Sequence, residues 1–219
     1  AMQAELLECA IRDTGGTALL TDIVASIATE LEPAPVAPHP SQRLTAPPAF
    51  DRDLCLEFAR GKVGNVLGPE FEIIDSYPVR VRLPDEPLML VDRILSVEGT
   101  KGVLGPGRVV TEHDVLPGTW YLDGDRCPIC ITVEAGQADL FLSGYLGIDF
   151  VAKGVRTYRL LDATVTFHRG LPRPGETIHY DIRIDRFVRQ GETYMFFSQF
   201  DWTIDGEPVL TMRNGCAGF

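Results

Sequence analysis

The sequence predicts an α+β protein in which a curved antiparallel sheet wraps around one central helix. Residues 129–150 form the one long apolar helix candidate, and they are apolar almost all round, which is typical of a buried helix. Four strand-like runs follow that segment, with short turn signals between them. Consecutive strands joined by short turns become antiparallel neighbours, so the pattern favours α+β over an alternating α/β arrangement.

The N-terminal part of the chain differs in composition from the rest. Residues 4–31 place leucine, isoleucine and valine at helical spacing, and residues 32–48 contain six prolines. A proline-rich stretch of this kind is typical of an extended linker that builds no core. We therefore predict two parts: residues 1–50 as an N-terminal helix with a proline-rich linker, and residues 51–219 as one packed domain.

Within the packed domain the elements are predicted from periodicity and turn residues. A short amphipathic helix is expected over residues 53–62, followed by glycine turns. Asp205-Gly206, between two apolar runs, is a strong hairpin signal. The strands are expected at residues 88–97, 103–111, 156–167, 177–188, 193–204 and 209–217.

Composition excludes some classes of function. The formal net charge is −11, and no run of lysine or arginine offers a phosphate-binding surface, so nucleic acid is not an expected partner. No apolar run approaches the roughly 20 residues that a membrane helix needs, so no membrane contact is expected either. Five cysteines are an odd number for a disulfide framework, which favours a reduced, cytoplasmic setting.

Histidine is the side chain best suited to proton transfer near neutral pH, and the chain has four. His113 ends a strand-like run shortly before the apolar helix. The other three lie in the linker (His39), at a strand end (His168) and inside a strand pattern (His179). Taken alone, His113 would more often be a structural or surface residue than a catalytic one.

Glu134 is the second residue that needs an explanation. It would lie about two turns into the apolar helix, for which Pro128 is a suitable first-turn residue. A lone carboxylate there is costly unless it is paired or protonated. It is either capped by an arginine or backbone groups, or it is a general acid whose pKa is raised by burial. The residues alone leave both possibilities open.

Several stretches of residues 51–219 resemble the β-hydroxyacyl-acyl carrier protein dehydratases. The likeness is strongest to the dehydratase domains of polyunsaturated fatty acid synthases and related polyketide-type enzymes. The segment 53–69 is similar to the N-terminal helix and glycine-rich turn of the stand-alone bacterial enzymes. The matching stretches are PDEPLMLVDRI at 84–94, EAGQADLFLSGYLG at 134–147 and MRNGCAGF at 212–219.

The resemblance implies a hot-dog fold, with a long helix enclosed by the sheet, and a pair of acid–base residues. A catalytic histidine on the loop before the helix corresponds to His113. An acid in the first turns of the helix corresponds to Glu134, when residues 128–135 are laid on the family's Pro-Gly-x-x-x-x-Asp/Glu-Ala pattern. Backbone N–H groups of Ile129 and Cys130 would bind the substrate oxygen, and Gln137 would also line the substrate site.

The sequence departs from the family pattern at three points. The gap from His113 to Glu134 is 21 positions, longer than in the stand-alone enzymes, with residues 120–126 as the apparent insertion. Ile129 replaces the glycine after the helix-start proline. Gln137 follows the acid by three positions instead of four, so Asp139 is retained as the alternative acid.

Two further motifs have residue types that could bind a ligand or a partner. Cys127-x-x-Cys130 has the spacing of a redox or zinc motif, but one such pair without a second pair or nearby histidines favours a structural role. Arg186 and Arg189 form a local basic spot in an acidic chain. An acidic acyl carrier protein could dock there.

These observations lead to the expectation of a dehydratase domain of a multidomain synthase. It would convert 3-hydroxyacyl thioesters on the phosphopantetheine of acyl carrier protein into trans-2-enoyl thioesters, with no metal or redox cofactor. Acyl carrier protein and other synthase domains are the expected partners, and the domain should pair with itself or with a sister hot-dog domain. The alternatives are a hot-dog thioesterase or enoyl hydratase, and a non-catalytic structural hot-dog domain.

Overall fold

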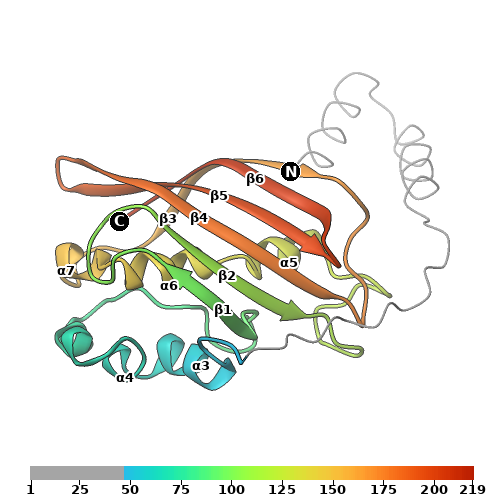
Figure 1. Cartoon of the computed structure of the whole chain (residues 1–219), viewed down its shortest axis with the longest axis horizontal. Helices are drawn as coiled ribbons and strands as arrows, with labels where there is room; N and C mark the ends of the chain where they lie inside the picture. Colours follow the sequence, from blue (N-terminus) through green and yellow to red (C-terminus); the bar gives the residue numbers. More distant parts are fainter. Residues whose placement is uncertain (1–46) are drawn as a thin grey trace, which may run out of the picture. The chain divides into compact units, whose positions relative to one another are not determined.

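The computed structural model describes residues 47–219, which form a six-stranded antiparallel sheet with helices packed against it (Figure 1). The predicted N-terminal helix at 4–31 and most of the proline-rich linker lie outside the described residues, so their assignment stays a prediction. The helices are α3 (Arg52–Arg60), α4 (Val63–Leu67), the 3-10 helix η1 (Pro69–Ser76), α5 (Ile129–Glu134), α6 (Ala138–Tyr145) and α7 (Ile148–Ala152). The strands are β1 (Arg93–Glu98), β2 (Gly107–Asp114), β3 (Arg159–Phe167), β4 (Thr177–Gln190), β5 (Thr193–Ile204) and β6 (Glu207–Gly218).

The sheet has the strand order β1-β2-β4-β5-β6-β3, and every neighbouring pair is antiparallel. The turn between β5 and β6 is the predicted Asp205-Gly206 pair, with φ angles of 53° and 82°. Two successive left-handed residues are what a tight hairpin turn requires, and Asp and Gly adopt them readily. The antiparallel sheet with helices packed against it confirms the predicted α+β class and the hot-dog arrangement.

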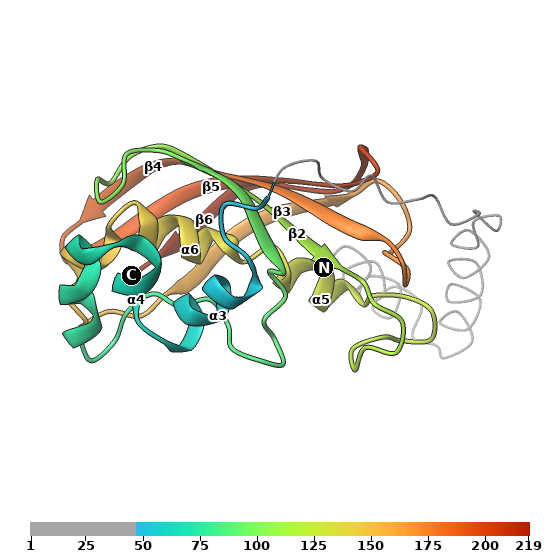
Figure 2. The same ribbon diagram turned by 60° about the horizontal axis from the view of Figure 1, so that its bottom comes forward.

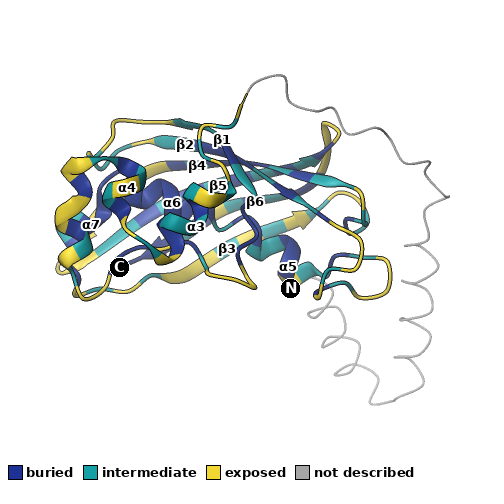
Figure 3. Ribbon diagram, turned by 90° about the horizontal axis from the view of Figure 1, so that it is seen from below, coloured by how far each residue is buried: buried dark blue, intermediate teal, exposed yellow. Residues whose placement is uncertain are grey.

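Burial places α6 at the centre of the fold. It lies against the sheet at β2 and β4, and Figure 3 shows it almost wholly in the buried colour. On its other side lies α3 (Figure 2). The Phe58 ring of α3 packs on Phe141 of α6, with 4.8 Å between the ring centroids. Asp51 caps α3 by accepting a hydrogen bond from Leu54 N at 3.0 Å. The helix predicted near residues 53–62 thus covers the central helix.

The single helix predicted over residues 129–150 is wrong, because the segment is divided into α5, α6 and α7. The first break is a tight turn in which Gly136 N and Gln137 N bond to carbonyls three residues back, at 3.1 Å and 3.0 Å. The second break is at Gly147, whose φ of +88° no L-residue adopts easily. Apolar periodicity reports burial of the whole segment, and it does not reveal where glycines interrupt the hydrogen bonding.

Contact with the sheet explains the glycine at the first break. A Cβ on Gly136 would lie 2.7 Å from the ring of Trp202, which is completely buried in β5. We expect Gly136→Ala to lower the free energy of unfolding by about 1–3 kcal/mol, the usual cost of overpacking a core. Urea titration followed by circular dichroism measures it. Gly105→Ala, where no atom lies closer than 3.9 Å, is the control, and equal losses in both variants would contradict this account.

The first two strands differ from their predicted bounds. Pairing in β1 begins at Arg93, although strand structure was expected from residue 88. The three residues Met89, Leu90 and Val91 precede the paired strand, and each is less than 5% exposed. Their apolar run therefore reflects burial and not strand pairing. The strand β2 begins four residues later than predicted and continues to Asp114. The segment before it turns through Gly99 and Gly102, both at positive φ.

Candidate active site

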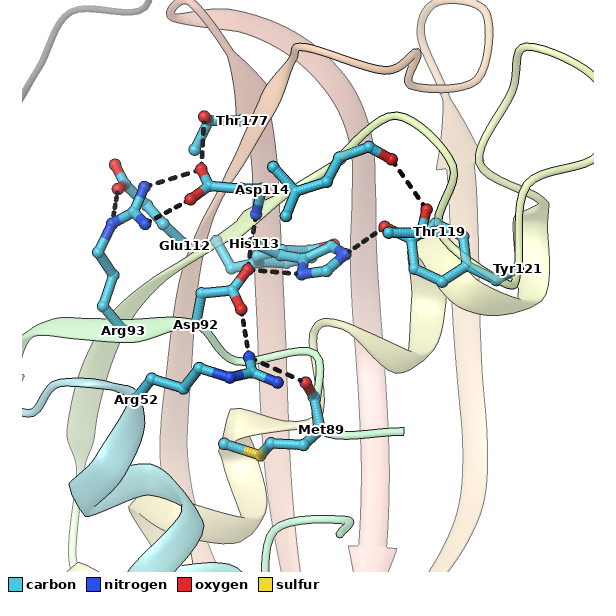
Figure 4. A network of polar contacts seen from close by, with 12 residues as sticks. Arg52, Met89, Asp92, Arg93, Glu112, His113, Asp114, Thr119, Tyr121 and Thr177 are labelled. Carbon is cyan, nitrogen blue, oxygen red and sulfur yellow. Dashed lines mark hydrogen bonds and ion pairs between the residues drawn. The ribbon is translucent and has the colours of Figure 1, made fainter. Parts of the chain in front are cut away.

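His113 lies one residue from the end of β2 and points into the protein, with 4% of its surface exposed. Its cross-strand partner is Ile178 of β4, so the backbone at this position is fixed by the sheet. Both ring nitrogens have partners: Nδ1 lies 2.9 Å from Asp92 Oδ2, and Nε2 lies 2.8 Å from the hydroxyl of Tyr121 (Figure 4). A buried histidine held at both nitrogens has one orientation of its ring.

Asp92 connects this histidine to the rest of the fold. Its Oδ2 also accepts a hydrogen bond from Asp114 N at 2.8 Å, and its Oδ1 pairs with the guanidinium of Arg52 on α3. Figure 4 shows the carboxylate between Arg52 and the His113 ring. The carboxylate that contacts His113 is thus also held by Arg52 of helix α3 and by the backbone of strand β2.

A second ion network supports the neighbouring residues of β2. Arg93 donates to Glu112 Oε2 at 2.7 Å and to both oxygens of Asp114 at 2.7 Å and 2.9 Å. Thr177 of β4 adds a hydrogen bond to Asp114 at 2.7 Å. The bond from Arg93 holds the pKa of Asp114 below its usual range, so this carboxylate stays ionised and acts as a brace for the strand end.

Tyr121 reaches His113 from the segment predicted as an insertion, residues 120–126. It is 7% exposed, and burial raises the pKa of its phenol, so the hydroxyl stays protonated and can donate. Trp120 packs edge-on against it but is itself 60% exposed. The insertion therefore covers the Nε2 side of the histidine with one buried aromatic residue and presents another to solvent.

Glu134 is the last residue of α5, at the break before α6, and not two turns into a long helix. Its carboxylate accepts a hydrogen bond from the side-chain amide of Gln137. Burial raises its pKa. A half-buried carboxyl with a raised pKa retains a proton to higher pH than a solvated one, as a general acid requires.

Asp139, the alternative acid, lies in the first turn of α6 and is 3% exposed. The hydroxyl of Tyr158 donates to its Oδ2 at 3.1 Å, while Oδ1 is buried without a hydrogen-bond partner. Burial raises the pKa of Asp139 to about 7. Proximity to Glu134 contributes to this rise, so the two carboxyls form one acidic cluster at the break between the helices.

The two halves of the predicted catalytic pair belong to different hydrogen-bonded groups. Among residues 47–219, no hydrogen bond or ion pair links His113 to Glu134 or to Asp139. His113 belongs with Asp92 and Tyr121 near the end of β2, and the two acids belong with Gln137 and Tyr158. Tyr180 of β4 connects the sheet to α5, since its hydroxyl donates to the backbone oxygen of Thr132 at 3.1 Å.

The start of α5 has free backbone donors. The first bond of the helix runs from Thr132 N to Pro128 O at 2.9 Å, so the N–H groups of Ile129 and Cys130 have no partner inside the helix. Cys130 is exposed and Ile129 is half-buried, so these donors lie near the surface. Their predicted contact with a substrate oxygen stays a prediction.

The remaining predicted site residues lie elsewhere. Arg186 and Arg189 are near the β4–β5 turn; the first stacks on the Phe197 ring at 4.1 Å and the second pairs with Glu192 at 3.6 Å. Cys127 is buried and Cys130 exposed, and both are free thiols. Within the described part of the chain no group of three potential metal ligands comes together. No helix in that part is both long and apolar enough to cross a membrane.

Three residues of the site were missed from the sequence. Asp92 was placed inside a strand pattern, and an acid within the apolar run LMLVDRIL was the available signal. Tyr121 and Tyr158 lie in segments whose contacts depend on the tertiary fold, so no local pattern marks them.

Residues 83–213 match the FabA-like domain family, and the chain therefore belongs to that family. A polyunsaturated fatty acid synthase subunit from Thraustochytrium sp. (strain ATCC 26185 / S-3) is 43% identical over 173 residues, which are 78% of this chain. The chain spans only 12% of the length of that relative.

Two solved structures are similar to the chain. The dehydratase heterocomplex ApeI:P from Xenorhabdus doucetiae aligns with a TM-score of 0.43 and 17% identity, over 65% of this chain and 88% of the other. The zebra fish thioesterase superfamily member 2 aligns with a TM-score of 0.40 and 18% identity, over 70% of this chain and 96% of the other.

Proposed function

We propose that this chain is a dehydratase domain of a multidomain synthase, acting on 3-hydroxyacyl thioesters carried by the phosphopantetheine of acyl carrier protein. The observation that carries the proposal is His113, a buried histidine whose Nδ1 lies 2.9 Å from Asp92 Oδ2 and whose Nε2 lies 2.8 Å from the Tyr121 hydroxyl. Membership of the FabA-like family and likeness to a fatty acid synthase polypeptide support this choice of chemistry. The free cysteines of the described residues fit a cytoplasmic setting.

In the proposed reaction His113 Nε2 takes a proton from the α-carbon, which the thioester carbonyl makes acidic. A protonated carboxyl, Glu134 in our assignment, gives its proton to the β-hydroxyl, which leaves as water while the Cα–Cβ double bond forms. Backbone N–H groups at Ile129 and Cys130 would bind the thioester oxygen as negative charge develops, with Gln137 beside the acid. The reaction requires no metal or redox cofactor. The substrate has to displace the Tyr121 hydroxyl from Nε2.

Mass spectrometry of a 3-hydroxyacyl carrier protein incubated with the chain tests this function. We expect the acyl carrier protein to lose the mass of one water and to keep its thioester. Release of the free carrier thiol would instead identify a thioesterase. No reaction in either direction, with the enoyl carrier protein tested as well, would identify a non-catalytic hot-dog domain.

Pairing with a second hot-dog domain is part of the proposal. Strand β3 ends the sheet, so one of its edges has no strand partner among the described residues. Leu160 and Leu161 on this strand are each 56% exposed. An apolar, unpaired edge strand is normally covered by another chain or domain.

We expect the chain to be dimeric in light scattering at micromolar concentration, and Leu161→Glu to shift it towards the monomer because a charge would be buried at the edge. Val103→Glu is the matched control, since Val103 is an equally exposed apolar residue (54%) in the turn before β2. A monomeric wild-type chain with full activity would contradict the pairing.

A further inference from the structure

Asp92 lies directly before β1, and its position is set by the backbone. Its N–H donates to Glu112 O of β2 at 3.0 Å, which extends the pairing of the two strands by one residue. Its side chain is 20% exposed, and the His113 side chain that it contacts is 5% exposed. The contact between them is therefore shielded from bulk water on the histidine side.

The Asp92 carboxylate contacts three nitrogen groups, of which the Asp114 N–H and the Arg52 guanidinium can only donate. Asp114 N and His113 Nδ1 share Oδ2, and the Arg52 guanidinium is on Oδ1. A carboxylate surrounded by donors and paired with a guanidinium is ionised, and an ionised carboxylate can only accept hydrogen bonds. His113 Nδ1 must therefore carry the proton of this contact.

The contact on the opposite side of the ring is compatible with this assignment. The Tyr121 hydroxyl is 2.8 Å from Nε2, and burial raises the pKa of the phenol, which favours its protonated, donating form. When Nδ1 carries the proton, Nε2 has a lone pair, and a phenol hydroxyl, which can donate or accept, then donates to it. The contact with the Asp92 carboxylate thus places the proton on Nδ1 and the lone pair on Nε2.

We propose that Asp92 is the positioning residue of the site: it holds His113 in the Nδ1-protonated tautomer, directs Nε2 to the substrate, and stabilises the imidazolium formed when the α-proton is taken. The inference rests on the proposed dehydratase function and deepens it. Asp92 does not touch the substrate. Arg52 does not contact His113 directly in this arrangement; it holds Oδ1 of the Asp92 carboxylate, whose Oδ2 contacts the histidine.

Asp92→Asn tests the inference in catalysis. An amide can present its NH₂ group to Nδ1, which selects the other tautomer and protonates Nε2, and it carries no charge to stabilise imidazolium. We expect kcat for dehydration to fall at least about 10-fold, a part of the 10²–10⁴-fold that a positioned proton-transfer group provides. KM should change little, because Asp92 makes no substrate contact.

Asp181→Asn is the matched control. Asp181, on β4, is likewise a half-buried aspartate paired with arginine: 16% of its side chain is exposed, and it pairs with Arg108 and Arg183. Its loss should affect stability about as much as the loss of Asp92 and leave kcat unchanged. Equal kcat values in Asp92→Asn and wild type, with both chains folded, would overturn the inference.

Nitrogen-15 NMR of the histidine ring tests the tautomer without any enzyme assay. In the wild-type chain we expect the neutral ring of His113 to show a protonated Nδ1 and a bare Nε2. In Asp92→Asn the Nε2-protonated form should appear. The wild-type spectrum suffices if that variant fails to fold, since a protonated Nε2 there would overturn the proposal.

The two measurements also separate this inference from the function on which it rests. An Nδ1-protonated His113 in a chain that dehydrates no 3-hydroxyacyl thioester would overturn the dehydratase proposal and leave the tautomer assignment standing. A chain that dehydrates its substrate with a protonated Nε2 would overturn the role of Asp92 and leave the function standing.

Discussion

His113→Ala is expected to lower the rate of dehydration at least about 100-fold, because positioned proton transfer contributes about 10²–10⁴-fold. The imidazole is the basic group at the centre of the hydrogen-bonded site, and its removal leaves the Tyr121 hydroxyl and the Asp92 carboxylate without their shared partner. Single-turnover assays with 3-hydroxyacyl carrier protein measure the chemical step directly.

His179→Ala is the control for that experiment. His179 lies in the adjacent strand, with 40% of its side chain exposed and Nδ1 at 3.3 Å from Glu112. Its removal should leave most of the activity, since it faces solvent and has no hydrogen bond to His113, Asp92 or Tyr121. If His113→Ala were harmless while the chain stayed folded, the dehydratase function itself would be rejected.

The sequence was sufficient for the architecture because the relevant signals are local. The alternation in residues 193–204 predicted β5 with both ends correct, and Asp205-Gly206 predicted its turn. Burial of the segment 129–150 was also correctly inferred, since a segment that is apolar on every side is stable only inside a protein. The interruptions of that segment were not inferred, because Gly136 is required by Trp202, which is distant in the sequence.

The site could be predicted only in part, for a related reason. His113 stood out by its place before the helix and by the family resemblance. Its partners come from the residue before β1 and from the inserted segment, and Arg52 of α3 holds the first of them, so their convergence is a property of the tertiary fold. An acid such as Asp92 in an apolar run indicates a buried polar contact, but the sequence does not identify the residue that makes this contact.

Burial raises the pKa of both candidate acids, Glu134 and Asp139, so substitution of each must identify the general acid. We expect Glu134→Gln to reduce dehydration at least about 100-fold while preserving the shape of the side chain. Combined with His113→Ala, the losses should be far less than multiplicative, because both groups act in one step. Asp139→Asn should retain most activity in our assignment, since the Asp139 side chain is enclosed by α6 and Tyr158.

Stability provides a second readout for Asp139. Burial raises its pKa in the folded chain to about 7 from an ordinary value of 3.8. The protonated form is therefore favoured by folding, and this contribution is present below about pH 4 and is lost as the pH rises through 7. Asparagine mimics the protonated form at every pH. The free energy of unfolding of Asp139→Asn, relative to wild type, should thus increase between pH 4 and pH 8.

These two readouts distinguish the roles of the neighbouring carboxyls. If Asp139→Asn abolishes turnover and Glu134→Gln does not, Asp139 is the acid, and Tyr158→Phe should then change the pH profile of turnover because its hydroxyl donates to Asp139. If neither acid matters and His113 does, water or a backbone group protonates the leaving hydroxyl. Loss of activity only in Glu134→Gln identifies the carboxyl at the break between α5 and α6 as the general acid, with Gln137 as its hydrogen-bond donor.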